Sequence, residues 1–177
     1  MTNKLQIKLL SKNATMPTRN HDADAGFDIY AAETVILEPQ QKALIATDIA
    51  VNIPKGYVGL LTSRSGVSSK THLVIETGKI DAGFTGNMKI NIKNDHETLE
   101  NWVSYHFSDD ALDIKGNIIP LDSKDKEEVM TGSYKINKGD KLAQLVIVPI
   151  WTPELQQVEE FTSESERGEK GFGSSGY

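Results

Sequence analysis

The sequence of 177 residues contains no cysteine, no long apolar run and no block of basic residues. Without cysteine, the chain forms neither a disulfide framework nor a thiolate metal site, and a reducing cytosol suits it. It also lacks the stretch of about 18 apolar residues that a membrane-spanning helix needs. Residues 1–6 lack the apolar core of a signal peptide. We therefore expect no membrane as a partner.

The charge balance argues against nucleic acid as a partner. The net charge is −6, whereas binding to a phosphate backbone needs a positive face. A small anionic ligand is still compatible with this charge, because a few well-placed donors are enough to hold it. The four histidines show no metal-ligand spacing, so we interpret them as surface residues; they are His21, His72, His96 and His106.

Short segments of alternating polarity indicate an all-β fold in one domain. Alternation predicts strands near residues 5–9, 35–37, 49–53 and 88–93. An apolar strand is expected at 57–61, and the nearly continuous apolar run 142–150 predicts a strand that is buried on both faces. Many short strands between Gly, Pro, Asn and Asp turns favour a sandwich or a jelly roll.

The segment from about 95 to 135 departs from this pattern and is acidic and mixed in character. Helix-like spacing is shown by Leu99, Trp102, Val103 and His106 or Phe107, which predicts a helix near 99–107. Asp95 or Thr98 is suited to cap such a helix. We interpret the segment as an insertion that stands off the β core. A long surface loop is the alternative.

The last eleven residues, 167–177, combine an arginine, one phenylalanine, paired serines and several glycines. Arginine fits phosphate oxygens, and glycine allows the backbone to approach a ligand closely. A lone aromatic ring is suited to cover a flat base. We interpret this tail as an arm that closes over a molecule with phosphates and a base, and a disordered Gly/Ser tail is the alternative.

Four further segments have the same mixture of glycine, hydroxyl and charge. Asp28 lies in an apolar run, where a buried carboxylate needs a partner and is more often a structural anchor than a site residue. Residues 62–70 follow a strand and predict a helical turn whose start suits an anion, or else a serine-capped turn.

The other two segments are centred on Asp81 and Gln144. Asp81 lies between glycines before an alternating strand, which fits a β-hairpin in which it is a turn residue or a general base. Gln144 interrupts an apolar strand, and a buried amide must be hydrogen-bonded. It therefore either bridges the core or faces a ligand.

The order and spacing of segments 25–28, 64–66, 78–81, 139–144 and 167–174 resemble the five motifs of the trimeric dUTPases. The resemblance covers nearly all of the chain outside about 95–135. It implies a β jelly roll that forms a homotrimer with three active sites at subunit interfaces. The implied reaction is hydrolysis of dUTP to dUMP and pyrophosphate, with Mg2+ held mainly by the triphosphate rather than by protein side chains.

The resemblance also implies roles for individual residues. Asp81 is the expected base that orients the attacking water, and Asp28 and Gln144 complete the catalytic set. Phe84 would pack under the deoxyribose, Arg167 would reach the γ-phosphate, and Phe172 would stack on uracil. The expected substrate contacts in full are Arg64, Ser65, Gly66, Gly78, Ile80, Phe84, Met88, Lys89, Arg167, Phe172, Gly173, Ser174 and Ser175.

Some positions depart from the motifs. Phe84 stands in place of a tyrosine, Gly83 and Thr85 replace the usual Asp and Arg, and Lys170 replaces a glycine. With its insertion, the pattern is similar to the dUTPases of staphylococcal phages. That similarity implies a phage-encoded protein in the cytoplasm of a bacterial host, and a second role in binding the Stl repressor of a mobile pathogenicity island.

Residues 1–166 are accordingly expected to form the β domain, with the insertion at about 95–135, and residues 167–177 to form the arm. Two other functions are considered. The related dCTP deaminases need a catalytic glutamate where this chain has Asn91, and an amide cannot cycle a proton as a carboxylate does. A weakly catalytic protein that mainly binds a regulator is the other alternative.

Overall fold

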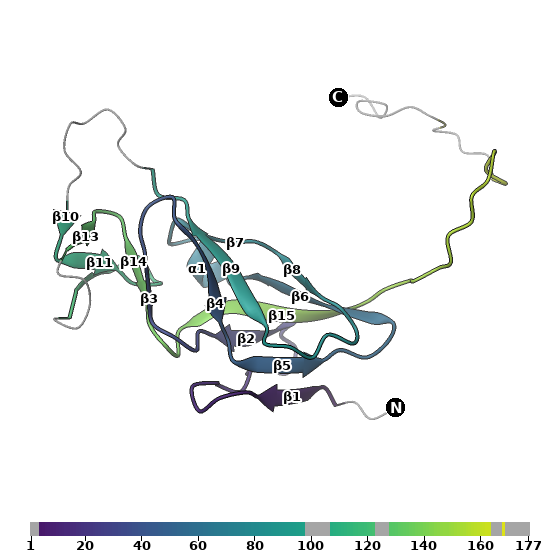
Figure 1. Ribbon diagram of the computed structural model, residues 1–177, viewed down its shortest axis with the longest axis horizontal. Coiled ribbons are helices and arrows are strands. Elements are labelled where there is room, and N and C mark those ends of the chain that lie inside the picture. Colours follow the sequence, from purple (N-terminus) through teal and green to yellow (C-terminus); the bar gives the residue numbers. More distant parts are fainter. Residues whose placement is uncertain (1–3, 98–106, 123–127, 164–167, 169–177) are drawn as a thin grey trace.

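The computed structural model describes residues 4–97, 107–122, 128–163 and 168. Two sheets form the body of the molecule (Figure 1). One has the strand order β2-β15-β6-β8, and the other has the order β4-β9-β7. Their bounds are β2 Gly26–Tyr30, β4 Lys42–Ala46, β6 Tyr57–Ser63, β7 Leu73–Ile75, β8 Gly78–Ile80, β9 Lys89–Asn94 and β15 Lys141–Pro149. A separate antiparallel pair joins β1 (Gln6–Leu9) to β5 (Ile49–Asn52).

The hydrophobic core lies between these sheets and takes side chains from both. Strand β9 shows the clearest pattern, because Ile90 and Ile92 are fully buried and alternate with polar residues that are not. From the other sheet, β15 contributes Leu142 and Leu145 to the same cluster. The predicted strands near 5–9, 35–37, 49–53, 57–61, 88–93 and 142–150 are thus confirmed, within one or two residues at their ends.

The predicted β-hairpin around Asp81 is wrong. Strand β8, which precedes Asp81, pairs with β6, whereas β9 pairs with β4 and β7. Residues 81–88 therefore cross from one sheet to the other. The physical reason is that Ile80 and Ile90 are both buried in the core between the two sheets. Ile80 enters this core from the β6 sheet and Ile90 enters it from the β4 and β7 sheet, so their strands do not pair with each other.

Part of the acidic segment continues a third sheet, with the order β12-β11-β14-β3. Its strands are β3 Val35–Leu37, β11 Asp110–Leu112, β12 Ile118–Pro120 and β14 Tyr134–Ile136. A small pair joins β10 (Phe107–Ser108) to β13 (Val129–Met130). The predicted helix near 99–107 falls mostly outside the described residues, and Phe107 itself lies in a strand.

Two glycines show close contacts of this segment, one within the segment itself and one with the body. Gly132 (φ 90°) lies so close to His96 that a Cβ atom there would be 2.9 Å from the imidazole ring. At the β11–β12 turn, a Cβ on Gly116 (φ 81°) would be 2.6 Å from the carbonyl oxygen of Lys70. Lys70 comes just after the short helix α1 (Ser65–Ser68), so the turn abuts the chain that leaves this helix.

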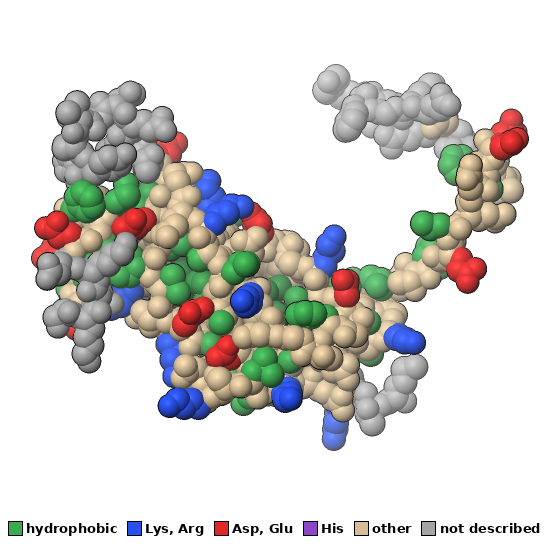
Figure 2. Space-filling model, in the orientation of Figure 1, with side chains coloured by type: hydrophobic (Ala, Val, Ile, Leu, Met, Phe, Trp, Pro, Cys, Tyr) green, Lys and Arg blue, Asp and Glu red, His purple; other side chains and the backbone are tan. Residues whose placement is uncertain are grey.

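That helix is far too short to cross a membrane, and the described part of the chain contains none that is long enough. After β15 the chain leaves the body as an extended segment (Figures 1 and 2). Trp151, Leu155 and Phe161 are 88%, 97% and 89% exposed. In isolated subunits these apolar side chains have no core to join.

Candidate active site

The predicted site residue Asp28 lies on β2 directly opposite Gln144 on β15. The Asp28 side chain is almost fully buried, and Gln144 donates a hydrogen bond from Nε2 to its Oδ1 over 3.2 Å. The alternation of β2 explains this position. Gly26 and Asp28 lie on the same face of the strand, and Gly26 has no side chain that would cover the carboxylate. The sequence prediction that a carboxylate here needs a partner is confirmed.

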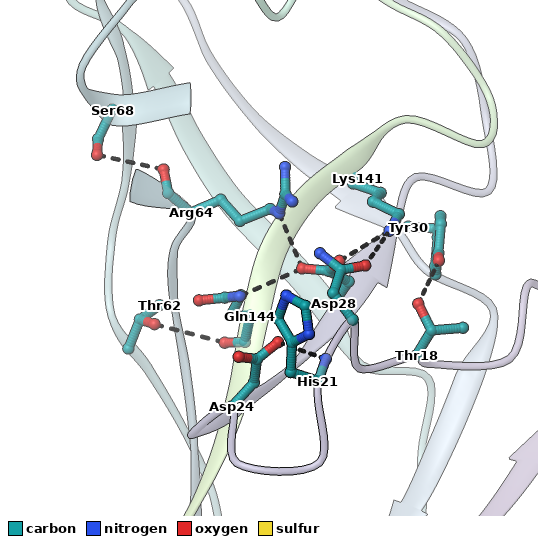
Figure 3. Close-up of polar contacts among 11 residues, drawn as sticks. Thr18, His21, Asp24, Asp28, Tyr30, Thr62, Arg64, Ser68, Lys141 and Gln144 are labelled. Carbon is teal, nitrogen blue, oxygen red and sulfur yellow. Dashed lines mark hydrogen bonds and ion pairs between the residues drawn. The ribbon is translucent and has the colours of Figure 1, made fainter. Parts of the chain in front are cut away.

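Two cations complete the surroundings of Asp28 (Figure 3). Arg64, the last residue before α1, donates from Nε to Oδ1 over 2.8 Å. Lys141 places its Nζ 3.0 Å from the other oxygen, Oδ2, as an ion pair. Lys141 also donates to Oδ1 of Asn20 over 3.3 Å. Sequence reasoning missed Lys141, although it belongs to the fourth motif.

The charges around Asp28 decide its ionisation. Burial alone would raise the pKa of this carboxyl group. The ion pair with Lys141, the hydrogen bonds from Arg64 and Gln144, and the positive charge of Arg64 outweigh burial and hold the pKa below its usual value. Conversely, the interaction with Asp28 raises the pKa of Lys141, against a smaller effect of burial. Asp28 is therefore an ionised anchor at neutral pH, with both of its oxygens engaged.

The predicted helical turn after Arg64 is confirmed as α1. Ser65 and Gly66 are exposed at its start, where the first N–H groups of a helix have no partner within the helix. The described contacts of Arg64 with Asp28 use only its Nε. In Figure 3 the Nε side of the guanidinium faces Asp28, and a terminal nitrogen extends away from the carboxylate. Residues 64–66 thus present several donors on one exposed edge, which is the composition that an anion needs.

Asp81 and Phe84 lie elsewhere in the same chain. Both are exposed on the connection from β8 to β9, and the Phe84 N–H donates to the Asp81 carbonyl oxygen over 3.1 Å. In the β6–β8 ladder, Ile80 is opposite Gly59. Arg64 is five residues beyond Gly59, which corresponds to about 16 Å along a strand. One subunit therefore does not bring Asp81 together with the Asp28 cluster.

The other predicted substrate contacts differ in their exposure and in whether their polar groups are already hydrogen-bonded. Gly78 and Ile80 are in β8, and Lys89 is exposed at the start of β9. Met88 is buried, its N–H donates to Ile49, and its carbonyl oxygen accepts two hydrogen bonds from Thr47. The backbone polar groups of Met88 are thus already bonded within the chain, and Met88 stays a predicted substrate contact. Arg167, Phe172, Gly173, Ser174 and Ser175 lie outside the described residues.

A pocket of about 250 Å³ occupies a different place, between the end of α1 and strand β7. Its lining includes Ser63, Ser68, His72 and Asp95, but neither Asp28 nor Asp81. A single subunit is not expected to show a cavity at a site whose two parts lie so far apart. The described residues contain no cluster of three or more His, Asp or Glu side chains suited to a metal ion.

Comparison with known proteins decides the family. The dUTPase family model matches residues 12–100 and 129–176. The chain belongs to the dUTPase family. The deoxyuridine 5'-triphosphate nucleotidohydrolase of Mycobacterium marinum is 35% identical to this dUTPase over 182 residues, covering 99% of this chain and 97% of its own. The human mitochondrial enzyme is 30% identical over 173 residues, covering 98% of this chain and 55% of its own.

Solved phage proteins are more similar still. The dUTPase of Staphylococcus bacteriophage 80alpha with dUpNHpp is 66% identical, with a TM-score of 0.89, and the match covers 99% of this chain and 100% of that one. The dUTPase of S. aureus phage phi11, whose structure visualises a species-specific insert, is 64% identical with a TM-score of 0.83, covering 92% and 100%. The predicted family, enzyme class and jelly-roll fold are confirmed, and so is the similarity to staphylococcal phage dUTPases.

Proposed function

We propose that this dUTPase hydrolyses dUTP to dUMP and pyrophosphate in sites that neighbouring copies of the chain complete together. Family membership supports the reaction. The separation of Asp81 from Arg64 within one chain carries the second part of the proposal. One subunit supplies the phosphate-binding side with Asp28, Arg64 and Gln144, and a second subunit of a homotrimer supplies Asp81 and Phe84.

The chemistry follows from the residue types. Asp81 is exposed and acts as the general base on a water molecule that attacks the α-phosphorus, while pyrophosphate leaves. Arg64 and the N–H groups of Ser65 and Gly66 bind phosphate oxygens. Phe84 packs against the deoxyribose, so that a 2′-hydroxyl has no room. Residues 167–177 close over the nucleotide. The described segment that precedes them, 150–163, leaves the body of its own subunit (Figure 1).

Mg2+ is the proposed metal ion, and the protein residues suit a metal that the nucleotide holds. Asp28 cannot ligate it, because both of its oxygens already contact cations or amide donors. When bound, Mg2+ neutralises charge on the triphosphate. A phi11 dUTPase structure that reveals the coordination of a structural Mg(II) ion supports a role for this metal. That protein is 64% identical, with a TM-score of 0.83, and the match covers 91% of this chain and all of that one.

A test of the shared site combines two inactive variants. Asp81→Asn damages one side of the shared site, and Arg64→Gln damages the other side. When the two chains are co-expressed with different tags, they form mixed trimers in which a site takes Arg64 from one variant and Asp81 from the other. Random mixing of a heterologous assembly restores about a quarter of the sites. As a matched control, Arg64→Gln mixed with Gln144→Ala should restore none, because both residues act from one subunit. Equal recovery in the two mixtures would refute the shared site.

We also propose that the insertion binds a regulatory protein of the Stl repressor type in the bacterial host cell. The family model skips residues 101–128, within the predicted insertion. The 80alpha structures concern phage dUTPases that control transfer of virulence genes by a G protein-like mechanism. Phe107 and Ile118 on strands of this segment are 57% and 73% exposed, as a protein-binding surface requires.

The contact between Gly116 and Lys70 supports competition between the repressor and dUTP. It joins the insertion to the end of α1, and the start of α1 carries the proposed phosphate contacts Ser65 and Gly66. A partner bound at this turn therefore lies on surface next to the phosphate-binding edge and competes with dUTP there. Pyrophosphate release from dUTP, measured with and without the repressor, tests the inhibition.

A further inference from the structure

Lys141 reaches Asp28 because of an irregularity in β15. The register pairs Lys141 with Tyr30 and Ala143 with Ile29, so Leu142 is an extra residue in the strand. In a regular strand, Lys141 and Gln144 would lie on opposite faces, because side chains alternate. The bulge adds one residue and brings both side chains to the face of Asp28.

The three charged groups leave the cluster with a surplus of positive charge. Asp28 contributes one negative charge, and Arg64 and Lys141 contribute one positive charge each. With Arg64 alone, the buried carboxylate would cancel the charge of the guanidinium. Lys141 pairs with Oδ2, the oxygen that Arg64 leaves unused, so both cations fit around one carboxylate.

We propose that Lys141 is a positioning residue for the triphosphate. It neutralises Asp28 from the side away from Arg64, so that the charge and the terminal N–H groups of Arg64 serve phosphate oxygens. The inference rests on the proposed function, in which Arg64 binds the triphosphate. The ligand class is any anion with a diphosphate or triphosphate group, and Lys141 itself does not touch it.

A purely structural role would act differently. Lys141 also contacts Asn20, so it connects the loop before β2 to the β15 strand. If that connection were its only function, loss of the charge would lower stability and affect all ligands alike. A positioning role instead predicts that the loss of affinity on removing the Lys141 charge is larger for ligands that carry more negative charge.

The experiment compares three variants of the full chain. Lys141→Met keeps the aliphatic stem without the charge, and Lys141→Arg keeps the charge. Lys138→Met is the matched control, because Lys138 is three residues away and donates to Asn13 rather than to Asp28. Dissociation constants for dUpNHpp and for dUMP are measured by calorimetry at two salt concentrations, together with kcat and KM.

We expect Lys141→Met to weaken dUpNHpp binding by on the order of tenfold, because the unneutralised Asp28 would then offset the charge that Arg64 offers to the phosphates. The loss for dUMP should be smaller, and the salt dependence of dUpNHpp binding should become shallower. Lys141→Arg should restore both. Lys138→Met should resemble the wild type. If Lys141→Met does not fold, Lys141→Gln retains hydrogen bonding without the charge and replaces it.

Equal losses for dUpNHpp and dUMP, or no rescue by Lys141→Arg, would overturn the inference. Arg64→Gln separates this failure from failure of the proposed function. If Arg64→Gln also leaves dUpNHpp binding unchanged, the proposed phosphate site is wrong. If Arg64→Gln abolishes binding and Lys141→Met has no effect, only the role of Lys141 is wrong.

Discussion

Asp28 and Gln144 face each other across β2 and β15, and the Gln144 amide donates to the buried carboxylate over 3.2 Å. This pair forms the floor of the proposed phosphate-binding side, because Arg64 donates to the same oxygen. A buried carboxylate that holds an arginine gives that arginine one orientation. We therefore expect ligand binding to depend on this anchor as well as on the residues that touch the ligand.

The lowered pKa of Asp28 predicts how stability depends on pH. Since its folded pKa lies below the unfolded value of about 3.9, the carboxylate stabilises the fold above that pH and loses this contribution as pH falls through the folded value. Asp28→Asn should therefore be destabilised most at neutral pH, and its difference from wild type should shrink below about pH 4. Urea unfolding from pH 7 to 3 measures this. Asp22→Asn, an exposed aspartate, is the control, and a difference that stays constant with pH would contradict the assignment.

Asp81→Asn should lose turnover and keep binding. The substitution retains the shape of the side chain but removes the base, and general-base catalysis is worth roughly 10²–10⁴-fold. Single-turnover hydrolysis of dUTP measures the loss, and binding of dUpNHpp, measured by calorimetry, should stay close to wild type. Near-normal turnover would require another base. Asp24→Asn, outside the connection that carries Asp81, serves as the control.

Phe84 should determine the choice between deoxyribose and ribose. Phe84→Ala opens the space for a 2′-hydroxyl and should reduce the preference for dUTP over UTP by about tenfold or more. Phe84→Tyr should retain it. Gly86→Ala gives an independent check, because its Cβ would lie 2.8 Å from the Phe84 ring and would push the ring aside. The ratio of kcat/KM for the two nucleotides measures the preference, and an unchanged ratio in Phe84→Ala would assign the choice to another residue.

Truncation before Arg167 should reduce hydrolysis without affecting the fold. The deletion removes an aromatic stack worth roughly 1–3 kcal/mol and a charge-assisted hydrogen bond of about 1.5–3 kcal/mol. kcat/KM for dUTP should fall steeply, while the melting temperature and the trimer, measured by light scattering, should stay near wild type. Dissociation of the trimer on truncation would make the arm a structural element instead.

The sequence predicted the strands well because their burial follows a simple alternation, as in β9. The sequence also pointed to Asp28, Arg64 and Gln144 as candidate site residues, since each interrupts or ends an apolar run, and the structure brings their side chains together. Lys141 escaped prediction because its position depends on the bulge at Leu142, and a bulge leaves no sign in the alternation of so apolar a strand. The connection after Asp81 was misread as a hairpin because local turn signals do not show which sheet each strand joins.

The insertion strands were also beyond prediction, because they are short and β11 pairs in parallel with β14, far along the chain.

The proposed role of the insertion gives a further prediction. Replacing residues 98–128 with a short Gly/Ser linker should preserve dUTP hydrolysis and weaken repressor binding. Trp102 and Tyr105, which lie outside the described residues, are removed together with Phe107 and Ile118.

Gly116→Ala provides a sharper version of the same test. Its Cβ would meet the Lys70 carbonyl oxygen at 2.6 Å, and its φ of 81° is itself unfavourable for alanine. We expect a loss of roughly 1–3 kcal/mol locally, with altered competition between dUpNHpp and the repressor rather than loss of either ligand. Gly56→Ala is the matched control, since Gly56 also has a positive φ (83°) but meets no neighbour there. Surface plasmon resonance of repressor binding across a dUpNHpp titration measures the coupling, and identical competition curves for the two variants would show that this contact does not transmit it.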